Sequence, residues 1–227
     1  MNAAPTSIPN ERPATRRREA TRARILDAAT AMLLADGLGP LSLHRLAAEL
    51  DFTTSALYRY FPSKDALLAE VVGALLATVA QDLRAAALRS RGASPLARLR
   101  AVVLRWVALA SEDGDPHRFN LIQQLFATPE RVFAEATHAE AAVDAMFEAL
   151  SPVTAALAES ADAGLLEPGD AQGRALILFA TVEGLLLLRK QAARAPRRLD
   201  PEGLIAPALD ALLRGWGAAP EPAATLA

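Results

Sequence analysis

The chain has 227 residues, of which 52% are hydrophobic, and its 24 Lys and Arg nearly balance its 26 Asp and Glu, for a formal net charge of -2. It contains no cysteine, which excludes disulfides and thiolate metal sites. Ala and Leu dominate the apolar residues, and because both favour helices, the composition predicts an all-α fold.

The charge is distributed unevenly along the chain. Residues 1–64 hold nine Lys and Arg against six Asp and Glu, whereas residues 65–227 hold 15 against 20. A basic end on an acidic body favours an anionic partner at the N-terminus only. Residues 1–19 contain several arginines but no apolar stretch, so we predict a disordered basic arm there rather than a signal peptide or a membrane anchor.

Thr21 to Gly37 has apolar residues at helical spacing along one side and predicts an amphipathic helix that ends at the glycine. The stretch from Leu41 to Leu68 predicts two short helices joined by a tight turn, followed by the start of another helix. Together these elements predict a three-helix module over about residues 20–66, in a helix-turn-helix arrangement. An ordinary helical hairpin with solvated polar residues is the alternative.

Three residues define the predicted turn and its flanks. Ser42 is placed to cap the first short helix, and Thr53 or its neighbour Thr54 is placed to cap the second. Asp51 occupies the turn position that requires a left-handed backbone, which Asp tolerates better than most residues do. The polar side of the second helix carries hydroxyls and a guanidinium, which suit phosphates and base edges in a major groove.

The sequence LYRYFPSKDALL, from Leu57 to Leu68, resembles the signature of the tetracycline-repressor (TetR) family of bacterial transcription regulators. The detailed resemblance covers about residues 20–70, and Asp51 stands where the family usually has Gly. It implies a cytoplasmic, homodimeric regulator that binds a palindromic operator in double-stranded DNA and is released by a small-molecule effector. Pattern and resemblance together predict DNA contacts by Arg22, Ser42, His44, Arg45, Thr53, Thr54, Ser55, Tyr58, Arg59, Tyr60 and Lys64.

Beyond this module, a capping residue followed by proline recurs five times and marks the expected helix starts. We assign residues 67–216 to an effector-binding and dimerisation domain and residues 217–227 to a disordered tail. The predicted helices lie near 64–89, 95–111, 116–126, 129–163 with a bend or break at Pro152, 170–194 and 201–216.

Residues 175–188 are apolar on nearly every side, but Glu183 and the short length argue against a membrane span. One side can face its own domain, while the other needs a partner, and the helix near 201–216 has a similar apolar stripe. Two such helices from each of two copies predict a four-helix dimer interface, with burial inside a monomer as the alternative. The predicted interface residues are Leu176, Phe179, Gly184, Leu187, Leu188, Leu209, Leu212 and Leu213.

The sequence gives no support for catalysis or metal binding. Glu135 and His138 have the spacing of a di-iron motif, but such sites need a second copy, which the chain lacks. No phosphate-binding glycine loop or nucleophile motif is present, so we expect no enzyme activity, no cofactor and no metal. A dimeric helical ligand-binding protein without DNA activity and a helical-bundle enzyme remain alternative functions.

A small-molecule pocket is expected in the C-terminal domain, where bulky apolar side chains mix with a few polar groups. Cationic residues are scarce among them, which argues against a strongly acidic ligand. The predicted pocket residues are Trp106, Phe119, Gln123, Phe126, Met146, Phe147, Phe179 and Glu183.

Overall fold

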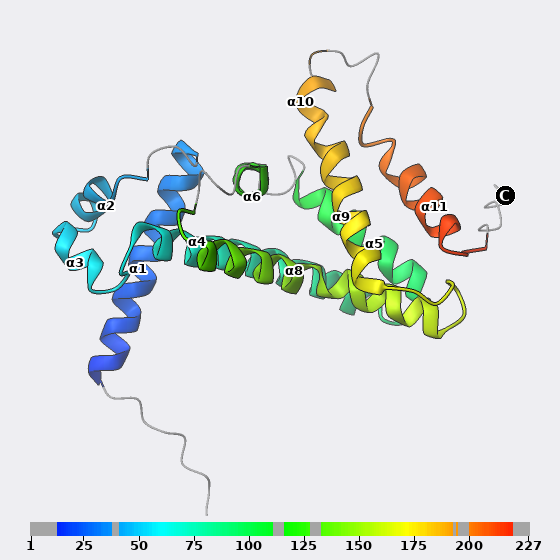
Figure 1. The fold of residues 1–227 in the computed structure, drawn as a ribbon, viewed down its shortest axis with the longest axis horizontal. Coiled ribbons are helices and arrows are strands. Elements are labelled where there is room, and N and C mark those ends of the chain that lie inside the picture. Colours follow the sequence, from blue (N-terminus) through cyan, green and yellow to red (C-terminus); the bar gives the residue numbers. More distant parts are fainter. Residues whose placement is uncertain are drawn as a thin grey trace, which may run out of the picture.

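The computed structural model describes residues 13–37, 41–110, 116–127, 133–192, 194 and 200–219, and every regular element in these ranges is a helix (Figure 1). The predicted all-α fold is confirmed. The helices are α1 (Pro13–Asp36), α2 (Leu43–Glu49), α3 (Thr54–Tyr58), α4 (Lys64–Arg89), α5 (Pro95–Leu109), α6 (Pro116–Ala127), α8 (Ala136–Asp162), α9 (Ala171–Leu187), α10 (Arg189–Ala192) and α11 (Ile205–Gly215).

The two short helices α2 and α3 are capped as the sequence predicts. The Ser42 hydroxyl accepts a hydrogen bond from the backbone N of Arg45 at 3.2 Å, and Thr53 Oγ1 accepts one from the backbone N of Ala56 at 3.2 Å. Asp51, in the turn between them, has φ 57°, which is the left-handed conformation that the turn requires. The local sequence therefore sets both ends of the helix-turn-helix.

Helix α1 begins at Pro13 rather than near Thr21, so residues 13–19 are helical and do not belong to a disordered arm. Proline is well tolerated in the first turn of a helix, and the Ala and Arg residues that follow are good helix formers. The sequence argument gave too much weight to the charge of this segment and too little to its helix propensity. In Figure 1 this half of α1 extends below α3. Residues 1–12 and 220–227 of the predicted arm and tail lie outside the described ranges.

Two hydrophobic cores share the long helix α4. Its first half, including Val71 and Leu75, packs with α1, α2 and α3, whereas Leu83 and Ala86 in its second half pack with α5, α8, α9 and α11. Val79 lies between these halves and packs against both cores. Figure 1 shows α4 running beside α8 from the N-terminal module into the C-terminal domain.

Three helix boundaries differ from the sequence prediction. Helix α8 continues through Pro152, which is buried, so the break that was one of the two expectations for this proline does not occur. Helix α9 stops at Leu187, and a separate turn of helix, α10, follows it. Helix α11 starts at Ile205, because Asp200 Oδ1 accepts a hydrogen bond from the Gly203 backbone N at 3.0 Å and caps a turn instead.

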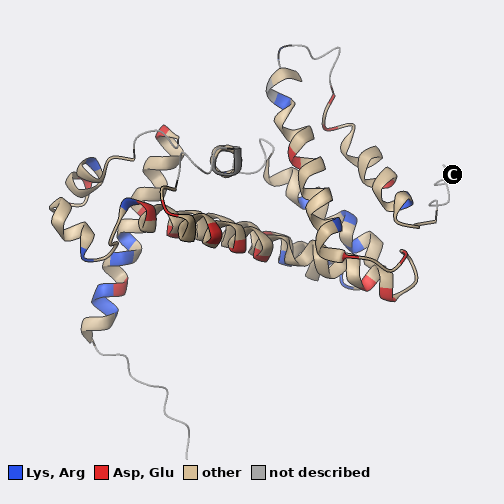
Figure 2. Cartoon of the chain, viewed as in Figure 1, with Lys and Arg blue, Asp and Glu red and all other residues tan. Residues whose placement is uncertain are grey.

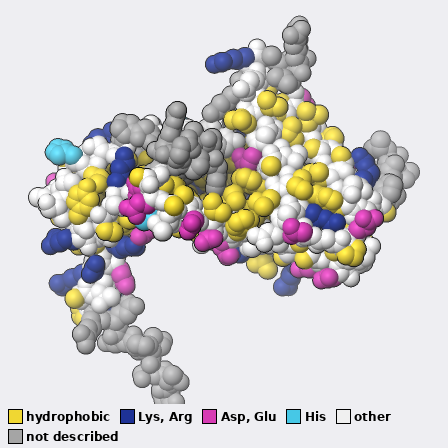
Figure 3. Space-filling view, viewed as in Figure 1, with side chains coloured by type: hydrophobic (Ala, Val, Ile, Leu, Met, Phe, Trp, Pro, Cys, Tyr) yellow, Lys and Arg dark blue, Asp and Glu magenta, His cyan; other side chains and the backbone are white. Residues whose placement is uncertain are grey.

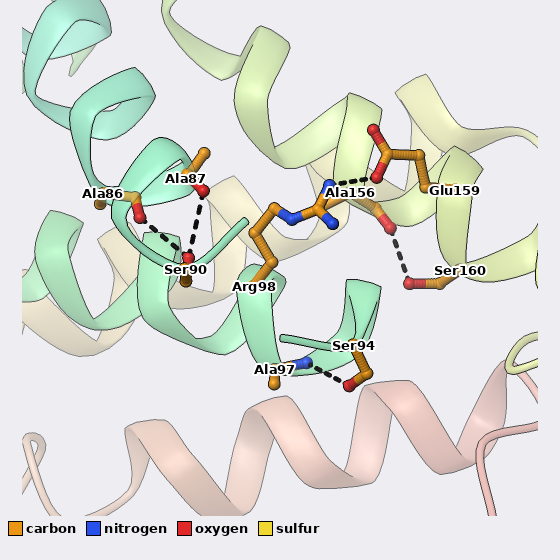
Figure 4. A network of polar contacts seen from close by, with 9 residues as sticks. All are labelled: Ala86, Ala87, Ser90, Ser94, Ala97, Arg98, Ala156, Glu159 and Ser160. Atoms are coloured by element: carbon orange, nitrogen blue, oxygen red, sulfur yellow. Dashed lines mark hydrogen bonds and ion pairs between the residues drawn. The ribbon is translucent and has the colours of Figure 1, made fainter. Parts of the chain in front are cut away.

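Several polar side chains at the far end of the C-terminal domain bond to groups on the same helix or a neighbouring one (Figure 4). Arg98 on α5 pairs with Glu159 on α8, which ties the two helices together. Ser160 is fully buried, and its hydroxyl donates to the Ala156 carbonyl oxygen at 2.6 Å. Ser94 caps α5 by accepting from the Ala97 backbone N at 3.2 Å. At this end of the domain, these polar side chains serve to hold helices α5 and α8 in place.

Among the described helices, α4 and α8 are long and apolar enough to cross a membrane by length and composition alone. Their most apolar windows have mean hydropathies of 1.6 and 1.3. In the fold, the two helices pack against each other and against α5, and each contributes buried residues to a core. Core packing therefore accounts for their apolar composition.

Candidate DNA interface and ligand pocket

The polar surface of the helix-turn-helix lies on α2, on α3 and just beyond α3. Tyr58 is 49% exposed, and His44, Ser55 and Arg59 are also exposed. Buried Leu57 and Phe61 hold α3 against the core, which keeps the polar side chains outward. Thr54, Tyr60 and Lys64 are half-buried, and Lys64 is the first residue of α4. An anion at that position would meet the free N–H groups of the helix end.

The two capping hydroxyls can serve DNA as well as their own helices. In their caps, Ser42 and Thr53 use the hydroxyl oxygen as an acceptor. A hydroxyl also carries one proton to donate, and this proton is not used by the cap. Each side chain can therefore hold its helix and donate to a phosphate oxygen together.

Two of the predicted DNA-contacting arginines have partners within the chain. Arg22 on α1 pairs with Glu70 on α4, and its guanidinium carbon lies 4.9 Å from the centroid of the Phe61 ring. Arg45 on α2 pairs with Asp36 at the end of α1. These contacts hold α1 against α4 and α2. Either guanidinium could contact DNA only while it keeps this ion pair or by giving it up.

A basic groove runs between the first half of α1 and the end of α3. Figure 2 marks several Lys and Arg positions in blue along this part of the α1 ribbon, and Arg18 Nη2 donates to the Arg59 carbonyl oxygen at 3.4 Å. Guanidiniums gathered around an open groove suit a phosphate backbone. The sequence predicted Arg59 and Tyr60 as DNA contacts but missed the α1 side of the groove, because it placed residues 1–19 in a disordered arm. The groove is lined by Ala14, Arg17, Arg18, Thr21, Arg59 and Tyr60.

The C-terminal domain contains a narrow, mostly apolar cavity of about 40 Å³ at the seam between the two cores. Leu76 and Ile122 belong to the core of the N-terminal module, and Leu83 and Trp106 belong to the other core. A cavity of this size holds a few water molecules, so a larger ligand has to displace side chains. Its lining is Leu76, Val79, Leu83, Trp106, Leu109, Phe119, Ile122, Met146, Ala149, Leu150, Phe179 and Glu183.

Glu183 is the polar centre of this cavity. Its carboxylate accepts hydrogen bonds from Trp106 Nε1 at 3.2 Å and from Gln123 Nε2 at 3.0 Å. Burial raises the pKa of Glu183 from 4.5 to about 7, and the two hydrogen bonds oppose this shift. Beside the carboxylate, the Trp106 and Phe179 rings stack with centroids 5.3 Å apart.

The structure brings six of the eight predicted pocket residues together: Trp106, Phe119, Met146, Phe179 and Glu183 line the cavity, and Gln123 bonds Glu183. Phe147 does not line it, and the Phe126 side chain lies outside the described part of the chain. The lining residues that sequence reasoning missed are aliphatic, and nothing in their pattern distinguishes a cavity wall from a core.

Helix α6 connects the cavity to the N-terminal module. Phe119 and Ile122 line the cavity, while Leu121 and Ile122 are buried in the core that α1 and α4 share. Helix α6 also contacts α1 directly. A movement of α6 would therefore change both the shape of the cavity and the packing of the N-terminal module.

One side of α9 is apolar and uncovered. Ile177 is 47% exposed, Leu187 54% and Leu188 38%, and Ala180 and Gly184 lie exposed at helical spacing between them. Figure 3 shows hydrophobic side chains spread over the part of the molecule that contains α9. The opposite side of α9 is buried, so the predicted two-sided character of this helix is present in the fold.

The interface prediction was wrong for Leu209 and Leu213, which are 4% and 1% exposed. They form the inner side of α11, which packs on α9 within the same chain. Leu176, Phe179 and Leu212 are half-buried against the same core. The outer side of α11 instead presents Leu204, Pro207 and Ala211.

Comparison with known proteins assigns the N-terminal module. Residues 25–71 match the protein-family model described as bacterial regulatory proteins of the tetR family. This range covers the second half of α1, the helix-turn-helix and the start of α4. No curated protein sequence matches the chain.

Several solved structures share the fold over most of their length. SmeT, the repressor of the Stenotrophomonas maltophilia multidrug efflux pump SmeDEF, is 27% identical, with a TM-score of 0.58 over 90% of this chain and 98% of its own. A putative tetR-family regulator from Mesorhizobium loti MAFF303099 is 21% identical, with a TM-score of 0.63 over 88% and 96%. RolR in complex with the ligand resorcinol is 16% identical, with a TM-score of 0.60 over 90% and 91%.

Proposed function

We propose that the chain is a homodimeric repressor, a DNA-binding transcription regulator of the TetR type that a small molecule releases from a palindromic operator. One observation carries the ligand-responsive part of this proposal. The cavity lies at the seam of the two cores, where Leu76 of α4 and Ile122 of α6 line it and also belong to the core of the N-terminal module. The likeness to SmeT, which is itself a repressor, supports the direction of regulation.

Dimerisation through α9 and α11 is supported by the uncovered apolar stripe. A twofold axis beside α9 would bring Ile177, Gly184 and Leu187 of two copies together, and their small or apolar side chains allow close helix packing. Two copies would then present two α3 helices to one face of a duplex. Such dimers read half-sites about one helical turn apart, which is why we expect a palindrome.

The proposed roles of the DNA-facing residues follow from their positions. Thr54 and Ser55 begin α3 and are placed to meet base edges, as the first residues of a recognition helix do. Ser42, Thr53, Tyr58 and Lys64 surround it and would bind phosphates. The basic groove along α1 would extend these phosphate contacts to Arg17 and Arg18, with His44, Arg45, Arg59 and Tyr60 at its margins.

Release would proceed through α4 and α6. A ligand larger than the cavity must push apart the side chains on Leu76, Ile122 and Met146, which lie on three different helices. Because α4 leads directly into the helix-turn-helix, its displacement changes the position of α3. In a dimer this would alter the spacing of the two recognition helices and weaken operator binding.

Selection of bound fragments from random duplex DNA by the purified full-length protein tests this function. We expect an enriched palindrome, bound by two chains, and loss of enrichment when Tyr58 and Lys64 are both replaced by Ala. Transcription from a promoter that carries the selected site should fall when the protein is added. Failure to enrich any sequence from a folded dimer would favour a ligand-binding protein without DNA activity.

A further inference from the structure

The ligand cavity holds an ionisable group without a counter-charge. Among the described residues that line it, Glu183 is the only charged one. Its two hydrogen-bond donors, Trp106 and Gln123, are neutral, and no ion pair joins it to a cation in the described part of the chain. A buried carboxylate in apolar surroundings is costly unless a positive charge is nearby.

The donors around Glu183 fix its position and leave room for a partner. Trp106 Nε1 binds one carboxylate oxygen and Gln123 Nε2 binds the other. Each carboxylate oxygen has about two lone-pair directions, so both retain acceptor capacity. Because Glu183 lines the cavity, this capacity is open to a bound molecule.

The surroundings of the carboxylate define the rest of the ligand. Trp106 and Phe179, whose rings stack on each other, both line the cavity, and Phe119 is a third aromatic lining residue. Leucine, valine and isoleucine side chains form most of what remains. Aromatic faces attract both apolar rings and cations, and the attraction to a cation strengthens where water is excluded.

We propose that the pocket binds a flat, hydrophobic organic amine in its protonated form, with the ammonium group paired to Glu183 and the ring system against Trp106 and Phe179. This assignment of ligand class rests on the proposed ligand response. An anionic ligand would be repelled by Glu183. A neutral one would supply no charge to pair with the carboxylate, so the carboxyl would be held in its neutral form.

Entry of such a ligand requires the cavity to widen, and its lining allows this. Met146 has three rotatable bonds and packs against both cores, so it can change rotamer without breaking either core. Phe119 and Ile122 lie on α6, a short helix. The ligand therefore gains access by displacing Met146 and α6.

Three probes that share the naphthalene ring system and differ in charge test the assignment by direct calorimetric titration. They are 1-naphthylmethylamine, 1-naphthalenemethanol and 1-naphthoic acid, which are cationic, neutral and anionic near pH 7.5. We expect the wild-type protein to bind the amine about 10- to 100-fold more tightly than the alcohol, as a close buried charge pair would give, and to bind the acid most weakly. Glu183→Gln should remove the preference for the amine.

Glu140→Gln is the matched control, because it removes the same charge from an exposed position on α8. It should leave the ranking of the three probes unchanged. The wild-type ranking is informative even if Glu183→Gln fails to fold. Equal affinities for amine and alcohol, a preference for the acid, failure of the amine to bind, or an amine preference that survives in folded Glu183→Gln would each overturn the assignment.

A separate measurement distinguishes the ligand class from the proposed function. Operator binding is followed by fluorescence anisotropy of labelled DNA in the presence of each probe. If the amine binds with the expected preference but does not release the DNA, the ligand class stands and the proposed release mechanism fails. If a neutral or anionic compound binds and releases DNA better than the amine does, the proposed release mechanism stands and the ligand class fails.

Discussion

Gln123 on α6 donates through Nε2 to Oε2 of Glu183 on α9 across 3.0 Å, and this bond joins the two helices across the cavity. The neighbour of Gln123 in the sequence, Ile122, is buried in the core of the DNA-binding module. The carboxylate at the centre of the cavity is therefore one helix away from that module. The bond thus links Glu183 to the helix that also packs in the core of that module.

The stability of the protein should depend on pH through Glu183. The pKa of its carboxyl group is raised to about 7 in the folded state from 4.5, so between these values the folded state holds a proton that the unfolded state has lost. Stability from this group is thus present at low pH and is lost as pH rises towards 7. Glu183→Gln should gain stability relative to wild type from pH 5 to pH 8, by at most about 3 kcal/mol.

Denaturant titrations at fixed protein concentration check this prediction, with Glu140→Gln as the control for a simple change of net charge. The Gln side chain keeps one acceptor, and the amide of Gln123 can turn over to satisfy the other position. A constant difference between Glu183→Gln and wild type across this pH range would show that the carboxyl is not perturbed.

Lys64→Ala should weaken DNA binding about equally for all sequences. The lysine begins α4, where its charge and the helix N-terminus together favour a phosphate. Loss of one phosphate contact lowers the slope of log affinity against log salt by roughly 1. Arg214→Ala, on the exposed side of α11, is the control and should leave the slope unchanged.

Thr54→Ala should instead change the DNA sequence that the protein selects from random duplexes. An identical selected sequence would remove Thr54 from base recognition.

Leu187→Arg should separate the dimer into folded monomers. Leu187 is 54% exposed in the single chain, so arginine at this position leaves the monomer core intact but places a charge in the proposed interface. Monomers should keep weak, salt-sensitive DNA binding and lose operator specificity. Sedimentation of the variant beside Leu88→Arg, at a leucine that is 66% exposed on α4, checks this. If Leu187→Arg remains a dimer, α9 is not the interface.

Asp51→Ala should destabilise the protein by about 1 kcal/mol, whereas Asp51→Gly should be nearly neutral. The backbone at this residue has φ 57°, where an ordinary side chain is strained and glycine is not. Glycine loses more chain entropy on folding, which offsets its gain. Thermal melts of the two variants should differ by a few degrees. A tolerant Asp51→Ala would mean that the turn relaxes to another conformation.

Ligand and operator should weaken each other by the same factor. A coupling of about 1–3 kcal/mol would correspond to a roughly 5- to 150-fold change in affinity. Calorimetric titration of a bound ligand into the free protein and into its operator complex measures this factor. Equal affinities would show that the ligand, although it occupies the cavity, does not act on DNA binding.

The helix-turn-helix was predictable because short-range chemistry determines it. Ser42 and Thr53 cap their helices by bonding residues three positions away, and Asp51 adopts its turn conformation from local preference. Local sequence did not decide between the bend and the break expected at Pro152, where the helix continues and the proline is buried. The packing of α8 against α4 and α5, which the local sequence does not specify, accompanies this uninterrupted helix.

The pocket was predictable in its polar and aromatic members and in Met146, but not in its aliphatic ones. Glu183 and Trp106 are distinctive residues in an apolar region, whereas Leu76 and Leu150 have the same pattern as any core leucine. The ion pair between Arg22 and Glu70 joins residues 48 positions apart, so no local pattern indicates that Arg22 is partly engaged within the chain. Likewise, which side of α11 faces inward depends on how it docks on α9.

The position of Met146 and Val79 on the seam bears on how such a protein acquires new specificities. Both residues pack against the two cores but are only partly buried, unlike Leu99 or Val102, which are fully enclosed. A substitution at the seam reshapes the cavity while leaving both cores filled, so its cost in folding is low. After gene duplication, one copy could therefore come to recognise a different compound through a few seam substitutions while its helix-turn-helix module stays unchanged.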